Sequence, residues 1–284
     1  MLIANLAALG TVIAAMVLLR GSWWLLLVAG GFAVVSTQVA FFGHDTGHRQ
    51  VTRRSGRSRL LGLLHANLLS GLSYGWWVDK HNAHHAHPND LESDPDVHPG
   101  VLVFDHESAA GRRGAAAWLT RHQAWLFFPL LLLEAINLHV SSVRALLGPG
   151  VRDRVLELSL LAVHFVAYAV LLATTMSWPQ AIAFVAIHKG LLGLYLGCSF
   201  APNHKGMPTL TDADELDFLR RQVLTSRNVP GSRPVDFVLG GLNYQIEHHL
   251  FPSMPRVNLR RVRPIVKQYC ATHGISYEEV PVWA

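Results

Sequence analysis

Residues 76–85 of the chain read WWVDKHNAHH, and three of these ten residues are histidines. In a helix, His81, His84 and His85 lie on one side, because residues three and four apart are neighbours on the helix surface. Imidazole nitrogens that converge in this way are typical metal ligands. Trp76 and Trp77 are typical of the boundary between membrane and water. The stretch therefore predicts a metal site on a helix beside a membrane.

Two further histidine clusters lie far from this stretch in the sequence. HDTGH, at residues 44–48, follows an apolar block, and QIEHH, at residues 245–249, repeats the i, i+3, i+4 spacing with glutamine in the first position. Asn203 and His204 follow another apolar block. A single cluster of this kind also occurs by chance or as a solvated turn. Three clusters that each lie beside an apolar segment favour a shared metal site.

The number of histidines favours two metal ions over one. The expected ligands are His44, His48, His81, His84, His85, His204, His248 and His249. A zinc site closes with about four ligands, whereas eight imidazoles suit two ions that keep positions for exchangeable ligands. Imidazole binds Fe, Cu, Ni and Zn alike, so these residues alone do not select the metal.

Several other residues are candidates for supporting roles around the metals. Gln245 and Asn203 are expected to make weak or water-mediated contacts, and His87 directly follows the second cluster. Acidic residues near the clusters are candidates to orient the imidazoles, with helix capping or surface exposure as the alternative: Asp45, Asp79, Asp94, Asp96 and Glu247. His164 and His188 lie inside apolar blocks, where an ionisable group is a functional candidate, although a neutral imidazole bonded to a neighbouring helix is the simpler interpretation.

Composition places much of the chain in a lipid bilayer. Half of the 284 residues are apolar and only 15% are charged, against about a quarter in soluble domains. The apolar residues form blocks, and a spanning helix needs about 20 of them. The two cysteines exclude a disulfide framework and a cysteine-based zinc motif. We therefore expect a membrane and a lipid as partners, and no nucleic acid.

The apolar blocks predict an all-α integral membrane protein with four spans. Two hairpins are expected, from Leu2–Leu19 with Trp23–Gly43 and from Val155–Thr175 with Pro179–Phe200. Ala124–Leu147 contains Glu134, Asn137 and His139 and has arginines on both sides, so it is expected to lie at the interface without crossing.

Arginine-rich segments stay in the cytoplasm, which places both termini and all histidine clusters there. A single domain results, 1–284, with hairpins at 1–43 and 155–200 and with a cytoplasmic helical cap formed by 44–154 and 201–284. The arginine-rich composition further suggests a bacterial cytoplasmic membrane.

The clusters and their context resemble the membrane fatty acid desaturases, whose histidine boxes are HxxxH, HxxHH and (H/Q)xxHH. All three occur here in that order, together with DPD at residues 94–96 and NYQIEHHLFP at residues 243–252, and the glutamine variant resembles the front-end and bacterial acyl desaturase branch. This resemblance implies that the eight histidines bind two iron ions and that Gln245 makes a weaker contact. It also implies an O2-dependent enzyme that introduces a cis double bond into the acyl chain of an acyl-lipid or acyl-CoA.

Some relatives carry a fused cytochrome b5 domain with a His-Pro-Gly-Gly motif. Here His98-Pro99-Gly100 is followed by Val101, so the resemblance implies a separate electron donor, a ferredoxin or a cytochrome b5-like protein with its reductase. A lipid hydroxylase, ketolase or epoxidase on the same scaffold remains open. A membrane metal transporter is the alternative from a different class, although its ligands would be expected in the middle of the membrane.

The sequence after the third cluster predicts an amphipathic helix that begins after Pro255. Arg256, Arg260, Arg263 and Lys267 fall on one face, Leu259, Val262, Val266 and Tyr269 fall on another, and Pro264 is expected to kink the helix. Such helices commonly lie on anionic lipid. A second hypothesis is that the cationic face docks an acidic redox partner.

Overall fold

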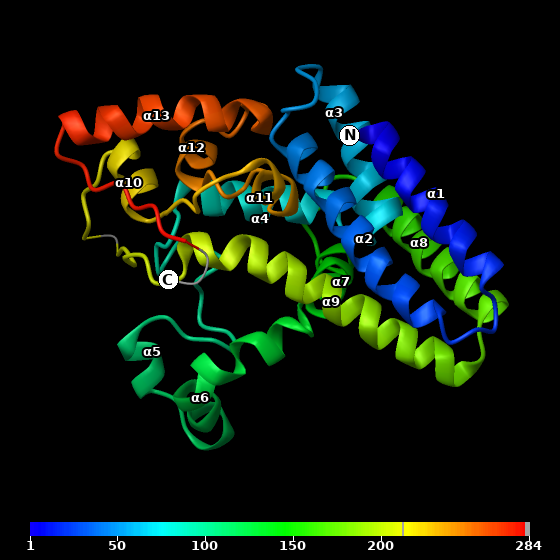
Figure 1. Cartoon of the computed structure of the whole chain (residues 1–284). Coiled ribbons are helices and arrows are strands. Elements are labelled where there is room, and N and C mark those ends of the chain that lie inside the picture. Colours follow the sequence, from blue (N-terminus) through cyan, green and yellow to red (C-terminus); the bar gives the residue numbers. More distant parts are fainter. Residues whose placement is uncertain (212, 282–284) are drawn as a thin grey trace. The chain divides into compact units, whose positions relative to one another are not determined.

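The computed structural model describes residues 1–211 and 213–281, and the regular secondary structure of this part of the chain is helical apart from two isolated β-bridges. Figure 1 shows the helices in chain order. They are α1 (Leu2–Leu18), α2 (Leu25–Gly47), α3 (Ser55–Gly62), the π-helix η1 (Leu63–Ser70), α4 (Tyr74–Ala86), α5 (His106–Ala110), α6 (Gly114–Leu131), α7 (Glu134–Leu147), α8 (Arg154–Thr175), α9 (Trp178–His204), α10 (Phe218–Leu224), α11 (Arg233–Val238), α12 (Gln245–Leu250) and α13 (Arg256–Thr272). The predicted all-α class is confirmed for these residues.

The chain divides into two compact units that we describe separately. The first unit comprises Met1–Val78 and Leu130–Gly197, and the second comprises Asp79–Pro129 and Cys198–Ala284. The first unit contains most of the apolar helices. The second contains the second and third histidine clusters.

Three helices among the described residues are long and apolar enough to cross a membrane, namely α2, α8 and α9. α1 is also apolar, but its 17 residues extend only about 26 Å at 1.5 Å per residue. A hydrocarbon core is about 30 Å thick, so α1 is short for a span on its own. The first expected hairpin therefore pairs one helix of full length with a shorter one.

The block at 124–147 is not the single helix that the sequence suggested. It is shared between α6 and α7, which together are apolar enough for a span but meet at an 83° bend. Polar Glu134 begins α7 immediately after the break. A bend of this size is the geometry of a broken span or a re-entrant segment, and not of a straight crossing helix.

The first unit is closed at one end by hydrogen bonds between its two tight turns. Gly21 adopts a positive φ of 74°, which glycine reaches without steric cost, and this allows the chain to reverse between α1 and α2. Its N–H donates to Thr175 O at 2.8 Å, and Gln180 Nε2 donates to Gly21 O at 2.8 Å. Beside these turns lies a core of Met16, Leu25, Ala29, Met176 and Phe184, with Val12 and Phe32.

In the second unit, α13 packs on α10 and α12 through a small apolar core. Val223, Ile246, Val266 and Cys270 are buried there, and Val262 packs against them. The helix begins after Pro255 as predicted and continues through Pro264. Part of the predicted apolar face therefore faces protein, which corrects the interpretation that this face lies on lipid.

The cationic face of α13 makes contacts within the second unit. Arg256 Nη1 donates to Gly240 O at 2.9 Å, Arg260 lies 3.6 Å from Asp236, and Arg263 and Lys267 both pair with Glu279. These internal partners weaken the hypothesis of a cationic face reserved for a redox partner. The described structure assigns α13 a clear role in covering the helix that carries the third cluster.

Candidate metal centre

Three separate segments of the second unit bring their histidines together. α4 carries His81, His84 and His85, α9 ends at His204, and α12 carries His248 and His249. α12 is only six residues long, and Gln245 to His249 are all buried in it. Residues from distant parts of the sequence thus form one buried imidazole cluster.

The centre of this cluster is formed by His84, His204 and His249. One ring nitrogen of each lies within 4.8 Å of one ring nitrogen of the others, and all three residues are buried. The ring centroids are 4.7 Å apart for His84 and His204, 4.8 Å for His204 and His249, and 5.0 Å for His84 and His249. Three imidazoles at this separation can converge on one metal ion.

Hydrogen bonds hold each of these three rings through its Nδ1 atom. His84 Nδ1 lies 2.9 Å from Asp94 Oδ2, His204 Nδ1 lies 3.1 Å from Thr225 O, and His249 Nδ1 lies 2.9 Å from Gln222 Oε1. Each partner is an acceptor, so each Nδ1 carries the hydrogen and each Nε2 keeps its lone pair. This is the arrangement by which proteins orient histidine ligands toward a metal.

The surroundings also keep His249 neutral. Burial lowers the pKa of His249 well below its ordinary value, and the neighbouring imidazoles lower it further. Its Nε2 atom is buried and makes no hydrogen bond with any described residue. A buried lone pair without a donor is costly unless it binds something, and a metal cation fits this donor set.

Gln245 and Asn203 lie beside His204. Gln245 Nε2 is 3.0 Å from His204 Nε2, and Asn203 Nδ2 is 3.4 Å from Gln245 Oε1 and 2.9 Å from Leu242 O. Asn203 therefore orients the carboxamide of Gln245, whose amide group faces the ring nitrogen of His204. The glutamine of the third cluster thus contacts His204, one of the three central imidazoles.

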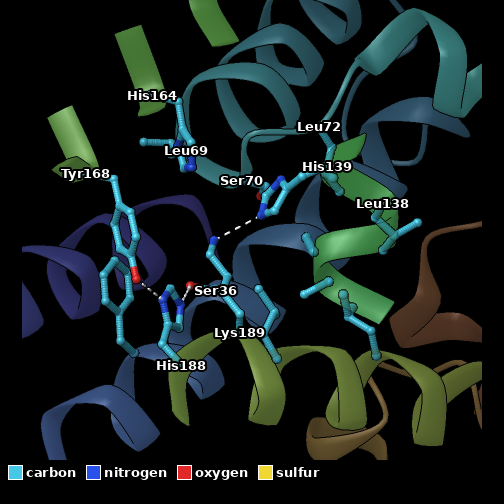
Figure 2. A pocket seen from close by; sticks show the side chains of 15 residues that line it. Ser36, Leu69, Ser70, Leu72, Leu138, His139, His164, Tyr168, His188 and Lys189 are labelled. Carbon is cyan, nitrogen blue, oxygen red and sulfur yellow. Dashed lines mark hydrogen bonds between the residues drawn. The ribbon is translucent and has the colours of Figure 1, made fainter. Parts of the chain in front are cut away.

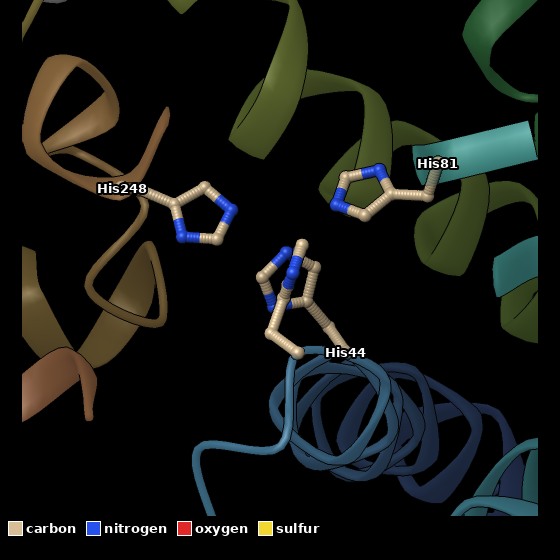
Figure 3. Close-up of side chains that lie close together, drawn as sticks. His44, His81 and His248 are labelled. Carbon is tan, nitrogen blue, oxygen red and sulfur yellow. The ribbon is translucent and has the colours of Figure 1, made fainter. Parts of the chain in front are cut away.

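The other histidines of the second unit form a neighbouring group. His85 Nε2 is 3.1 Å from His81 Nε2, and the ring centroids of His85 and His248 are 4.7 Å apart. His81 projects from α4 and His248 from α12, with centroids 6.3 Å apart (Figure 3). His85 also stacks on His249 at 4.2 Å, so the two groups are continuous.

The first cluster lies at the end of α2, in the first unit. His44 projects from this helix (Figure 3), and its ring centroid is 4.7 Å from that of His48. Both side chains are buried. The carboxylate of Asp45 is 3.7 Å from His44 Nδ1, which is longer than a hydrogen bond. The two imidazoles therefore lie close together at the end of α2, as their spacing predicts.

The acidic candidates and His87 differ in what they contact. Asp94 binds His84, and the carboxylate of Asp96 lies 3.6 Å from His84 Nδ1. Asp96 also pairs with Lys80, whose ammonium group lowers the pKa of Asp96 to about 2. Glu247 instead accepts hydrogen bonds from Asn228 and Tyr277, both at 2.7 Å, while burial raises the pKa of Glu247. Asp79 and His87 are exposed, and His87 contacts Arg221 at 3.3 Å.

Gln222 and Thr225 were not found from the sequence. Both belong to α10 or its end, in a segment without a histidine motif, and they act through one side-chain and one backbone oxygen. Gln222 Nε2 also donates to His85 O at 3.0 Å, so this residue connects α4 with α12. Nothing in the spacing of the sequence places α10 beside the clusters.

Glu157 was also missed, and it holds the first turn of the helix that carries the second cluster. Its carboxylate accepts hydrogen bonds from Asn67 Nδ2 at 2.9 Å, Ser73 Oγ at 2.7 Å and Gly75 N at 3.1 Å. A Cβ atom at Gly75 would lie 2.7 Å from Glu157 Oε1, so glycine permits this approach. The sequence feature that could have identified Glu157 is its position as an acidic residue in the first turn of an otherwise apolar block.

We expect the substitution Glu157→Ala to destabilise the protein by about 2–4 kcal/mol, because it leaves the buried donors of Asn67 and Ser73 and the backbone N–H of Gly75 without an acceptor. Thermal unfolding of the detergent-purified protein measures the effect. Glu157→Gln keeps one acceptor oxygen, so this variant should lose less stability. Glu107→Ala, on the exposed face of α5, should lose little stability. An unchanged melting temperature for Glu157→Ala would contradict this role.

Buried imidazoles that are oriented by hydrogen bonds, in a chain with membrane-length helices, define the class of integral membrane metal-site proteins. Comparisons with known proteins narrow this class. Residues 21–281 match the fatty acid desaturase family. The chain is 30% identical, over 92% of its length, to Delta(8)-fatty-acid desaturase 2 of Arabidopsis thaliana, and covers 61% of that protein.

Two further relatives are also named as desaturases. The acyl-lipid (9-3)-desaturase of Borago officinalis is 32% identical over 84% of the chain, which covers 56% of that protein. The Delta 8-(E)-sphingolipid desaturase of Emericella nidulans is 29% identical over 84% of the chain, which covers 48% of it. The chain thus spans about half to three fifths of the length of these relatives. It belongs to the fatty acid desaturase family.

Proposed function

We propose that this protein is an O2-dependent acyl desaturase that introduces a cis double bond into the hydrocarbon chain of a lipid. The observation that carries the proposal is the group of His84, His204 and His249, whose rings are held by three hydrogen bonds at Nδ1 so that each Nε2 carries the lone pair. Membership of the fatty acid desaturase family and the names of the relatives support the reaction type.

The reaction removes two hydrogens from adjacent methylene groups. Together with two electrons from a donor and two protons, these hydrogens reduce one O2 to two water molecules. No amino-acid side chain is oxidising enough for this step, so bound iron with O2 supplies the oxidising power. The protein's own task is to hold the metals, to position the chain and to limit access of water.

Eight histidines are proposed to hold two iron ions. His84, His204 and His249 supply part of the set, and His81, His85 and His248 form the adjoining group in the second unit. We assign His44 and His48 to the same role because their HxxxH spacing matches the first histidine box. Gln245, oriented by Asn203, is proposed to contact the centre weakly or through water.

Iron content is the experiment that tests this assignment. We expect close to two irons per chain in protein purified anaerobically from detergent, with loss of both ions on prolonged chelation. The metal identity comes from elemental analysis, which distinguishes iron from zinc and copper. A stoichiometric zinc content with no iron, in protein that retains turnover, would contradict the proposal.

We further propose that the metal side and both termini face the cytoplasm and that a separate protein supplies the electrons. Arginine-rich segments on both sides of 124–147 support this orientation. A ferredoxin or a cytochrome b5-like protein with its reductase is the proposed donor. The named relatives are eukaryotic, so they add no support to the bacterial origin suggested by composition.

Reporter tags test the proposed orientation. Tags at the N-terminus, near Arg57, near Gly150 and at the C-terminus should report the cytoplasm, whereas a tag at Ser177 should report the opposite side. The bend between α6 and α7 makes Gly150 the informative position. A signal from the opposite side at Gly150 would mean that this pair of helices crosses the membrane.

A further inference from the structure

A small polar cavity lies among the apolar helices of the first unit. Its volume is about 30 Å³, room for one or two water-sized groups. Ser36, Ser70, His139, His164 and Lys189 line it, together with Tyr168 and His188 (Figure 2). Leu69, Leu138, Leu192 and Leu196 form apolar parts of the same wall. Polar groups in such helices are costly and usually mark a functional site.

Backbone carbonyls fix the tautomers of two of these histidines. His139 Nδ1 donates to Gly71 O at 2.9 Å, and His164 Nδ1 donates to Leu68 O at 2.9 Å. The Nε2 atom of each ring is therefore an acceptor. Lys189 Nζ donates to His139 Nε2 at 2.9 Å, which satisfies that acceptor (Figure 2).

Two polar atoms that line the cavity have no hydrogen-bond partner among the described residues. They are His164 Nε2, which is an acceptor, and Ser70 Oγ, which can donate or accept. His188, by contrast, is satisfied by Tyr168 Oη at 2.8 Å and Ser36 Oγ at 3.2 Å. The unsatisfied groups call for a ligand that donates one hydrogen bond and accepts another.

The charges around the cavity restrict the ligand further. No acidic residue in the described part of the chain lines the cavity, and its one ammonium group is that of Lys189. A metal cation is therefore disfavoured beside this amine. A purely apolar group would leave His164 Nε2 and Ser70 Oγ without partners, at a cost of about 1–3 kcal/mol each.

We propose that this cavity binds the hydroxyl group of a lipid, whose hydrocarbon chain extends out of the cavity past its leucine side chains. The hydroxyl donates its hydrogen to His164 Nε2 and accepts from Ser70 Oγ or Lys189 Nζ. A hydroxyl group fits the volume, offers both hydrogen-bond functions and carries no charge. The site lies within the first unit and requires neither iron nor turnover.

Photoaffinity labelling of the detergent-purified protein, without an electron donor, tests the site independently of the reaction. The probe is a long-chain primary alcohol with a diazirine on a carbon near the hydroxyl. Labelled residues, mapped by mass spectrometry, should fall in η1, α7 or α8 beside the cavity. Excess 1-dodecanol should suppress this labelling, whereas dodecyl methyl ether, which cannot donate, should compete roughly tenfold less well.

Variants complete the test. Ser70→Ala and His164→Phe should each weaken labelling roughly tenfold, because each removes one hydrogen bond to the probe. His65→Phe is the matched control, because His65 Nε2 is also buried without a partner among the described residues but does not line the cavity. If His164→Phe fails to fold, the Ser70→Ala variant and the competition between 1-dodecanol and dodecyl methyl ether still test the proposal.

Two outcomes would overturn the proposal. Equal competition by the alcohol and the ether would show that only the apolar chain is recognised. Labelling elsewhere in the chain, unaffected by Ser70→Ala, would leave the cavity as a site for water alone. Neither result depends on desaturation, so the proposed function would stand or fall separately.

Discussion

Replacing His249 with alanine is expected to abolish iron binding at the buried centre and to reduce turnover below detection. His249 contributes a buried Nε2 atom with no other partner in the described structure, and its ring is held by Gln222 at 2.9 Å. Removing the imidazole deletes one of three converging donors and leaves a cavity between His84 and His204. A site with two donors does not retain a metal ion against chelation.

The matched control is His87→Ala, which removes a histidine next to the second cluster. His87 is exposed and contacts Arg221, so iron content and turnover should stay near the wild-type values. Membrane insertion of both variants is checked by fractionation. Full iron content in His249→Ala would remove this residue from the ligand set.

Replacing Gln222 with methionine is expected to weaken iron binding roughly 10- to 100-fold, the usual effect of losing a partner that orients a histidine ligand. Methionine keeps the length of the side chain but loses the acceptor for His249 Nδ1 and the donor to His85 O. The His249 ring can then rotate or change tautomer. Titration of metal-loaded protein with a chelator gives the apparent affinity.

The substitution Gln222→Glu separates two roles of this side chain, which are to orient the His249 ring and to fill space in the core. A carboxylate keeps the acceptor for His249 Nδ1, so iron affinity should recover in part even though the bond to His85 O is lost. A purely structural role predicts equal losses for both variants, together with equal losses in melting temperature. Equal affinities for the two variants would therefore contradict the orienting role of Gln222.

The sequence predicts the histidine clusters well because their chemistry is local. The i, i+3, i+4 spacing places His81, His84 and His85 on one side of α4, and the same spacing operates in α12. His204 could be chosen because it closes an apolar block. These signals depend only on helical periodicity and on the cost of polar groups beside lipid.

The groups that orient the histidines depend on tertiary contacts and are largely invisible to spacing. Asp94 was one of several acidic candidates. Glu247 instead contacts Asn228, and Asp96 pairs with Lys80. Gln222 and the carbonyl oxygen of Thr225 reach the cluster only because α10 packs beside α12. No pattern in residues 218–225 marks them.

The membrane helices were predicted in position and less well in shape. Apolar content locates α2, α8 and α9, but it does not reveal that 124–147 breaks at an 83° bend. Amphipathicity in 256–272 was recognised, yet periodicity cannot distinguish an apolar face that meets lipid from one that packs on Ile246 and Val223. The missing information in both cases is the identity of the packing partner.

The most direct test of the account is the product formed in lipids after expression in a host that lacks the activity and supplies an electron donor. Mass spectrometry of the extracted acyl and long-chain-base fractions should show a product two hydrogens lighter than its precursor, absent with His249→Ala. Ozonolysis then locates the new double bond. A product one oxygen atom heavier, with no new double bond, would contradict desaturation and identify a hydroxylase on the same metal centre.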